Sequence, residues 1–285
     1  MIVALVLVSA FLHAAWNALL RVEPNKDKSL VGAIACASTF ACIVAGVRWA
    51  LGGVPFDNIA ALLWTLLAGA FEAVYFATLA RALELGRLGT VYTVSRGGAV
   101  LVVWPMSIAL YGEVVSVPAM AGSLTVLAGL VLSSFGIKAA VSTEQSAHRK
   151  GVAWAAVCAV SIAGYHLAYK AGLREGGNPS AIFAVSLSAS ALISIARIGT
   201  AGRARLREVF TARWPRISLM GMLCGGSFLI LMEALARGGS GYVLTLRNTS
   251  VLFATLLAWT IGEKPRHVEI VGSILVAAGA VLMSL

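Results

Sequence analysis

Long apolar runs separated by short polar stretches fill almost the whole chain. Ten of these runs are long enough to form membrane helices: 2–21, 29–51, 60–84, 89–111, 116–137, 150–173, 179–199, 214–236, 241–261 and 266–284. About 20 apolar residues cross the hydrocarbon core of a bilayer as a helix. Backbone groups in lipid must bond within their own segment, so helices are expected rather than open sheets. The pattern predicts an all-α polytopic membrane protein with ten transmembrane helices. Its two longest polar stretches, 138–151 and 197–216, are expected to be loops.

The chain also repeats itself with a period close to 150 residues. At an offset of 150, Gly112-Glu113 matches Gly262-Glu263, Gly122-Ser123 matches Gly272-Ser273, and Gly129 matches Gly279. The stretch 80–93 matches 232–245 at an offset of 152, and Trp16-Asn17 matches Tyr165-His166 at an offset of 149. The repeat divides the chain into a first five-helix repeat (1–137), a linker (138–149) and a second five-helix repeat (150–285). Because five is odd, the second repeat must enter the membrane from the opposite side. Two inverted repeats around a central cavity are common in secondary transporters, which bind substrate near the midplane.

Composition and charge fit this arrangement. Hydrophobic residues make up 59% of the chain and charged residues 12%, against about 25% charged residues in soluble domains. The net charge of +10 is explained by cytoplasmic loops rich in Lys and Arg, so nucleic acid is not an expected partner. Lys26, Lys28, Arg149, Lys150 and several arginines between 203 and 216 follow odd-numbered helices. We expect a multi-pass protein of a bacterial-type inner membrane, with both termini outside.

Several of these stretches resemble one family of membrane proteins. The opening "HAAWNALLR", the Gly-Glu pairs, and "VYTVSRGGAVLVVWPMSIALYGE" and "LTLRNTSVLFATLLAWTIGE" are similar to ten-helix EamA-type members of the drug/metabolite transporter superfamily. The resemblance implies a single bundle around a cavity lined by helices 1, 3, 4, 6, 8 and 9. It also implies transport of small organic metabolites, often as efflux. Trp104-Pro105 departs from the pattern, because many relatives place a proline nearer the start of helix 4.

Two arginines lie inside predicted membrane helices and are matched by the repeat. Arg96 lies about 10 Å into helix 4, and Arg247 lies at a similar depth in helix 9, next to Asn248. A charge near mid-helix normally faces a partner or a watery cavity. Guanidinium groups suit carboxylate or phosphonate oxygens. The alternative is structural, with Glu233 pairing with Arg247 and Glu84 with Arg96.

Other polar residues complete the expected site. Glu72, near the middle of helix 3, either carries a proton or binds an amine, the alternative being a neutral hydrogen-bonded carboxyl. Tyr75 lies on the same helix face. Trp16 and Asn17 pair by the repeat with Tyr165 and His166, and all four are expected to line the cavity. His13 and Arg21 continue the polar stripe of helix 1, where Arg21, like Lys170 of helix 6, is expected to reach the membrane interface.

Two further features are interpreted as structural. Gly122 and Gly129, like Gly272 and Gly279, are seven residues apart, which suits close helix packing. Glu113 and Glu263 precede helices 5 and 10, where a carboxylate favours a helix N-terminus. We expect no cofactor, no metal site and no enzyme activity, because no nucleotide-binding loop, nucleophile–base pair or metal-ligand cluster is evident.

These features favour a secondary transporter of small zwitterionic or anionic metabolites, such as amino acids or organophosphonates, that works as an exporter by alternating access. Its expected partner is a small-molecule substrate, with a proton as a candidate coupling ion. Efflux of lipophilic cationic drugs is the alternative within this class, and a non-transport membrane scaffold is the alternative outside it. The sequence does not decide the oligomeric state.

Overall fold

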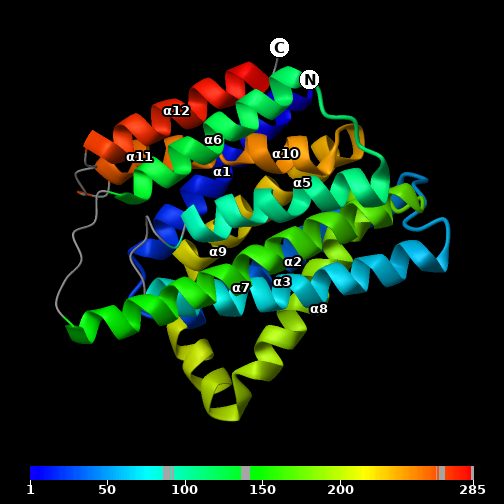
Figure 1. Ribbon diagram of the computed structural model, residues 1–285. Helices are drawn as coiled ribbons and strands as arrows, with labels where there is room; N and C mark the ends of the chain where they lie inside the picture. Colours follow the sequence, from blue (N-terminus) through cyan, green and yellow to red (C-terminus); the bar gives the residue numbers. More distant parts are fainter. Residues whose placement is uncertain (86–90, 92, 136–141, 261, 263–266, 284–285) are drawn as a thin grey trace.

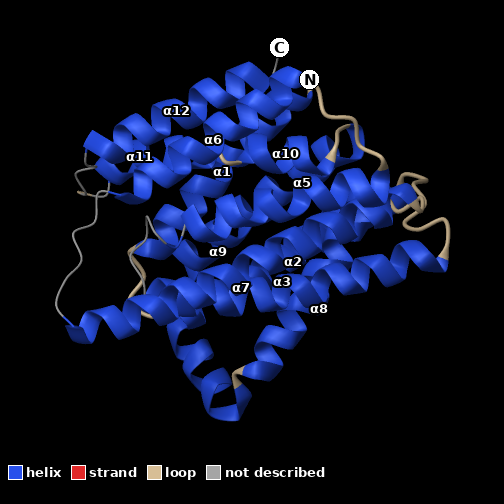
Figure 2. Ribbon diagram, in the orientation of Figure 1, coloured by secondary structure: helices blue, strands red, loops and turns tan. Residues whose placement is uncertain are grey.

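The computed structural model describes residues 1–85, 91, 93–135, 142–260, 262 and 267–283. In that part of the chain the protein consists of helices joined by loops (Figure 2). The elements are α1 (Ile2–Arg21), α2 (Lys26–Ala50), α3 (Ile59–Leu85), the π-helix η1 (Thr93–Gly97), α5 (Gly98–Tyr111), α6 (Val117–Phe135), α7 (Ser142–Arg174), α8 (Pro179–Arg197), α9 (Gly199–Arg237), α10 (Ser240–Arg247), α11 (Ser250–Thr260) and α12 (His267–Met283).

The prediction of an all-helical polytopic membrane protein is confirmed. Every one of the ten predicted segments coincides with helical structure among the described residues. Seven of the described helices are long and apolar enough to cross a bilayer, and shorter apolar helices lie at Val117–Leu132 and Ile270–Met283. The ninth segment is divided between α10 and α11.

The two helices that carry the predicted arginines are both irregular at the arginine. Arg96 lies in the π-helix Thr93–Gly97, directly before α5. Arg247 is the last residue of α10, and the chain makes a short break at Asn248 and Thr249 before α11 begins. Single-turn π-segments and interrupted membrane helices both occur frequently at functional sites. The prediction of one continuous helix over 241–261 is therefore wrong at 248–249, whereas 93–111 is helical throughout, first as a π-helix and then as α5.

The predicted loop at 197–216 is also wrong, because α9 begins at Gly199 and continues into the membrane. Its course bends at Arg213, whose φ of −134° and ψ of 23° are not helical, two residues before Pro215. A Cβ built at Gly32 of α2 would lie 3.3 Å from Phe210 and 3.6 Å from Leu206. This apolar face therefore packs on α2, and the arginines that share the segment make it look like a loop. The predicted loop at 138–151 is shorter too, since α7 begins at Ser142.

The helices of the two halves are interleaved. α3 packs on α7, α1 packs on α9, and α2 contacts both α8 and α9. α6 and α12 lie side by side (Figure 1). A Cβ built at Gly129 would lie 2.5 Å from the carbonyl oxygen of Gly272, and one at Gly279 would lie 2.7 Å from that of Gly122. The predicted role of these glycines in close helix packing is confirmed.

Candidate functional site

A group of polar side chains lies deep in the bundle, where α1, α3, α7, α9, η1 and α10 approach one another. Six of them are each at most 3% exposed: His13, Glu72, Arg96, His166, Arg247 and Asn248. Because this part of the bundle is sealed from solvent, every unsatisfied polar atom in it is costly. Two sets of contacting side chains can be distinguished there: the arginine group (His13, Arg96 and Arg247) and the glutamate group (Glu72, Tyr169 and, from α8, Ser186).

The two arginines meet at His13. Arg96 Nη2 contacts His13 Nε2, and Arg247 Nη2 lies 3.1 Å from His13 Nδ1. Trp16 Nε1 donates to the same Nδ1 at 3.2 Å. The sequence predicted both arginines and Trp16 as site residues but gave His13 no part in binding. Its position four residues before Asn17 on the polar stripe of helix 1 was the available signal.

The arginine group contains more hydrogen-bond donors than acceptors. A guanidinium group and an indole N–H only donate, and a neutral imidazole accepts at only one of its two nitrogens. Since an arginine faces each ring nitrogen, His13 cannot accept from both arginines at once. Arg247 Nη2 also donates to Ser227 Oγ at 3.2 Å, but Nε and Nη1 of Arg247 have no hydrogen-bond partner among the described residues. The donors of the arginine group therefore outnumber the acceptors that the described residues offer them.

The structural alternative for the arginines is wrong in its pairings. Glu233 lies 2.6 Å from Arg48 and 2.6 Å from Arg237, at the surface of the bundle. Glu84 pairs with Arg81 at 3.0 Å. Instead of a carboxylate, the guanidinium of Arg247 has the ring of Phe228 beside it, with Cζ 4.2 Å from the ring centroid. A cation over an aromatic face is attracted to it.

The glutamate group is built around a fully buried carboxyl. Glu72 Oε1 accepts a hydrogen bond from the Tyr169 hydroxyl, and Ser186 Oγ donates to that hydroxyl at 3.3 Å. Glu72 Oε2 has no hydrogen-bond partner within the described parts of the chain. Tyr75, which was expected beside Glu72, packs its ring on Tyr165 at 5.6 Å between centroids. Tyr169 was missed as a site residue, although it follows His166 by one helical turn.

Aromatic rings lie beside both groups. The ring of Tyr165 lies 5.5 Å from that of Tyr169 and 6.1 Å from that of Phe228, between centroids. Its neighbour His166 is 4.8 Å away, and neither ring nitrogen of His166 has a hydrogen-bond partner among the described residues. The ring of Tyr165 therefore contacts both Tyr169 of the glutamate group and Phe228, which lies beside Arg247.

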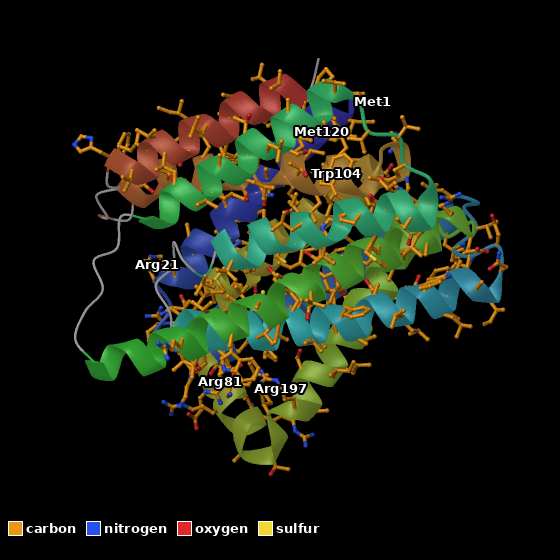
Figure 3. The ribbon with its side chains drawn as sticks, viewed as in Figure 1. Met1, Arg21, Arg81, Trp104, Met120 and Arg197 are labelled. Carbon is orange, nitrogen blue, oxygen red and sulfur yellow. The ribbon has the colours of Figure 1, made fainter. Side chains whose placement is uncertain are left out.

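The remaining predicted residues differ in what they contact. Asn17 is half-buried, and its amide donates to the backbone oxygen of His13 at 2.7 Å, within its own helix. Asn248 is fully buried at the break after α10, where neither its side-chain oxygen nor its nitrogen has a partner in the described structure. Arg21 lies at the end of α1 (Figure 3). Lys170 donates to the backbone oxygens of Leu235 and Gly238 at 3.0 and 2.7 Å.

Polar contacts between the halves lie on both sides of the buried residues along the bundle. At one end, Oε1 of the buried Glu23 accepts from Arg213 at 3.0 Å and lies 3.1 Å from Arg216 Nε. At the other end, Glu113 accepts from the backbone N–H groups of Ser240 and Gly241. Glu113 was expected to stabilise the N-terminus of its own following helix, but the structure places it at α10, which lies in the second half. Its counterpart Glu263 is outside the described residues.

Comparison with known proteins finds a matching family model and matching solved structures. The model of the EamA-like transporter family matches residues 149–285. A solved structure described only as "Crystal structure of protein" superimposes with a TM-score of 0.71 at 20% sequence identity, covering 100% of this chain and 96% of that one. At this identity the likeness shows the fold alone. No curated protein matches the chain.

Proposed function

We propose that the chain is a multi-pass membrane transporter of the drug/metabolite type that exports small zwitterionic or anionic metabolites, because its residues 149–285 match the EamA-like transporter family. Amino acids and organophosphonates are the classes that we consider first. The proposal concerns the substrate, the direction of transport and the mechanism. It depends on the chemistry of the buried polar residues.

The observation that carries the proposal is the convergence of Arg96 and Arg247 on His13. Two cations held together in a water-excluded site repel each other, and an anion placed between them removes that repulsion. Carboxylate and phosphonate oxygens accept from guanidinium groups through short, charge-assisted bonds. The unpartnered Nε and Nη1 of Arg247 and the amide of Asn248 supply further donors.

Glu72, in the glutamate group, can take a different role from that of the two arginines. A buried carboxyl with one unpartnered oxygen can accept from a substrate ammonium group or can carry a proton. A zwitterion would then place its anionic end at the arginine group and its amine near Glu72, beside the ring of Tyr165, which contacts Tyr169. A lipophilic cation would have one favourable partner and two repulsive ones.

Alternating access is supported by how the two halves contact each other. Ser38 and Ser188 are 150 residues apart, the period of the repeat, and their hydroxyl oxygens lie 2.8 Å apart. Gly122 approaches Gly279 while Gly129 approaches Gly272, so α6 and α12 run antiparallel and their contacts are unchanged when the halves are exchanged. These contacts support an inverted repeat, in which the bundle can open first at one end and then at the other.

Solute efflux from proteoliposomes tests the proposal. Vesicles loaded with a mixture of amino acids, organophosphonates and lipophilic cations would be analysed for released compounds by mass spectrometry. We expect release of a zwitterion or anion by the wild type and by Arg237→Ala, a control arginine that pairs with Glu233 near the surface. Arg247→Ala should abolish that release. Selective release of a cation, or release unaffected by Arg247→Ala, would contradict the proposed substrate class.

A further inference from the structure

The start of α10 is held by a carboxylate from the other half of the protein. The residue before α10 is Gly239, which has no side chain to accept from the first N–H groups of the helix. Glu113, just beyond α5, takes that role: Oε1 accepts from Ser240 N at 2.6 Å and Oε2 from Gly241 N at 3.3 Å. The first N–H groups of a helix have no partner within it, and a negative charge is favoured there.

The fit between α10 and the first half is close along its length. A Cβ at Gly239 would lie 2.7 Å from Glu113 Oε2, and one at Gly241 would lie 2.5 Å from the Trp104 indole. Glycine at both positions therefore allows the carboxylate and the indole to approach the backbone. Trp104 also donates from Nε1 to Thr245 Oγ1 at 3.0 Å, and Figure 3 labels it where α5 meets α10.

The other end of α10 carries Arg247. The helix has eight residues, so its ends are about 10 Å apart at a rise of 1.5 Å per residue. A hydrogen-bonded helix of this length moves as a unit, and a shift at Ser240 is transmitted to Arg247. The Nη2 contacts of Arg247 with His13 and Ser227 depend on that placement.

We propose that Glu113 is a positioning residue, which fixes Arg247 in the binding site by holding the start of α10. Closure of the two halves at this end of the bundle then also brings Arg247 into the proposed anion site. When the halves separate here, α10 is released from Glu113 and Arg247 leaves His13. The inference rests on the proposed function, since it assigns Arg247 to the substrate.

Chemical modification of Arg247 tests this directly and needs no substrate. The full-length protein in detergent would be treated with phenylglyoxal, and the modified arginines quantified by mass spectrometry. Arg247 is fully buried and should react slowly in the wild type. In Glu113→Ala we expect the reaction of Arg247 with phenylglyoxal to accelerate about tenfold or more. Displacing α10 to expose Arg247 then no longer requires breaking the charge-assisted hydrogen bonds to Glu113. Glu113→Gln, which keeps one acceptor oxygen, should show a smaller acceleration.

Two controls distinguish a specific release of α10 from a general destabilisation of the protein. Arg96 in the same sample is an internal reference, because a merely destabilised protein would expose both buried arginines. Glu233→Ala removes another carboxylate from the last turn of α9 and should leave Arg247 protected. The inference is overturned if Glu113→Ala leaves the reaction of Arg247 unchanged, accelerates Arg96 equally, or has the same effect as Glu233→Ala. Where Glu113→Ala does not fold, the same comparisons are made with Glu113→Gln.

The outcome is distinct from that of the efflux experiment. Efflux unaffected by Arg247→Ala removes Arg247 from the substrate site, whether or not Glu113 holds α10. Efflux lost in Arg247→Ala, together with an unchanged reaction of Arg247 in Glu113→Ala, removes only the positioning role.

Discussion

His13 connects the two arginines of the candidate site. An imidazole is the acceptor that both guanidinium groups reach, one at each ring nitrogen. Because only one nitrogen of a neutral ring accepts, the donors of the two arginines outnumber the acceptor that the imidazole offers. We propose that an anionic group of the substrate accepts from the remaining donors.

Replacing His13 by Phe should therefore be more costly than making the same replacement at His166. His13→Phe fills a similar volume but removes the acceptor shared by Arg96, Arg247 and Trp16, and leaving buried donors unsatisfied costs about 1–3 kcal/mol, more for charged groups. His166, whose ring nitrogens have no partner among the described residues, loses no hydrogen bond to the protein. Thermal unfolding in detergent measures both. A larger loss of stability in His166→Phe would show that the contacts at His13 are not stabilising.

The hydroxyl of Tyr169 should matter for stability in the same way. Tyr169→Phe removes the donor to Glu72 Oε1 and leaves the buried carboxyl without that bond, at a cost of about 1–3 kcal/mol. Ser186→Ala is the milder control, because Ser186 also bonds the backbone oxygen of Phe183 and lies one step further from the carboxyl. Equal thermal midpoints for Tyr169→Phe and the wild type would contradict the assigned role of this hydrogen bond.

Which residues form the site could be predicted only in part. A charged residue within a membrane helix is costly and therefore rare unless it has a function, so Glu72, Arg96 and Arg247 could be predicted as site residues from the sequence. Their mutual distances were not, because no common partner was predicted for the two arginines and His13 was given no part in binding. Tyr169 resembled an ordinary packing aromatic, and its bond to Glu72 depends on how α7 faces α3.

At the scale of whole elements, apolar length predicted the helices but not their interruptions. The break falls in the polar run 247–250, but that run contains no proline and apolar residues resume directly after Ser250, so the segment was predicted as one helix. The segment after Gly199 was mistaken for a loop for a related reason. Its many arginines give the segment the polar composition of a loop, although Leu206 and Phe210 pack near Gly32 of α2.

The glycines between α6 and α12 provide a prediction for these elements. Gly129→Ala should lower the thermal midpoint, because its Cβ would lie 2.5 Å from the Gly272 oxygen, and overpacking costs about 1–3 kcal/mol. Gly46→Ala in α2 is the matched control, with no atom within 4 Å of the new Cβ, and it should be neutral or slightly stabilising. Similar midpoints for the two variants would mean that α6 and α12 are not in close contact.

For the molecule as a whole, the polar contacts at the two ends of the bundle connect one half to the other. Glu23 belongs to the first half and contacts Arg213 and Arg216 of the second. Glu113 also belongs to the first half and contacts Ser240 and Gly241 of the second. The sequence predicted the two halves but neither contact, since each depends on the packing of residues more than a hundred positions apart.

Removing the contact at Glu23 should open that end of the bundle. In a variant whose only cysteine is the buried Cys158 of α7, Glu23→Gln is expected to accelerate modification by a small maleimide, because Arg213 and Arg216 lose their shared carboxylate. Glu208→Gln is the control, since that carboxylate forms an exposed pair with Arg205. Unchanged labelling in Glu23→Gln would show that this contact does not keep the end closed.

The central claim is that an anionic group of the substrate binds between Arg96 and Arg247, and thermal stabilisation of the purified protein tests it most directly. The wild type, Arg96→Ala, Arg247→Ala and the control Arg237→Ala would be screened against amino acids, phosphonates and lipophilic cations. A ligand present at a hundred times its dissociation constant stabilises the folded state by about 2.7 kcal/mol. We predict stabilisation by an anionic or zwitterionic compound in the wild type and in Arg237→Ala, lost in both Arg96→Ala and Arg247→Ala. Stabilisation that persists in these two variants, or that appears only with cations, would contradict the claim.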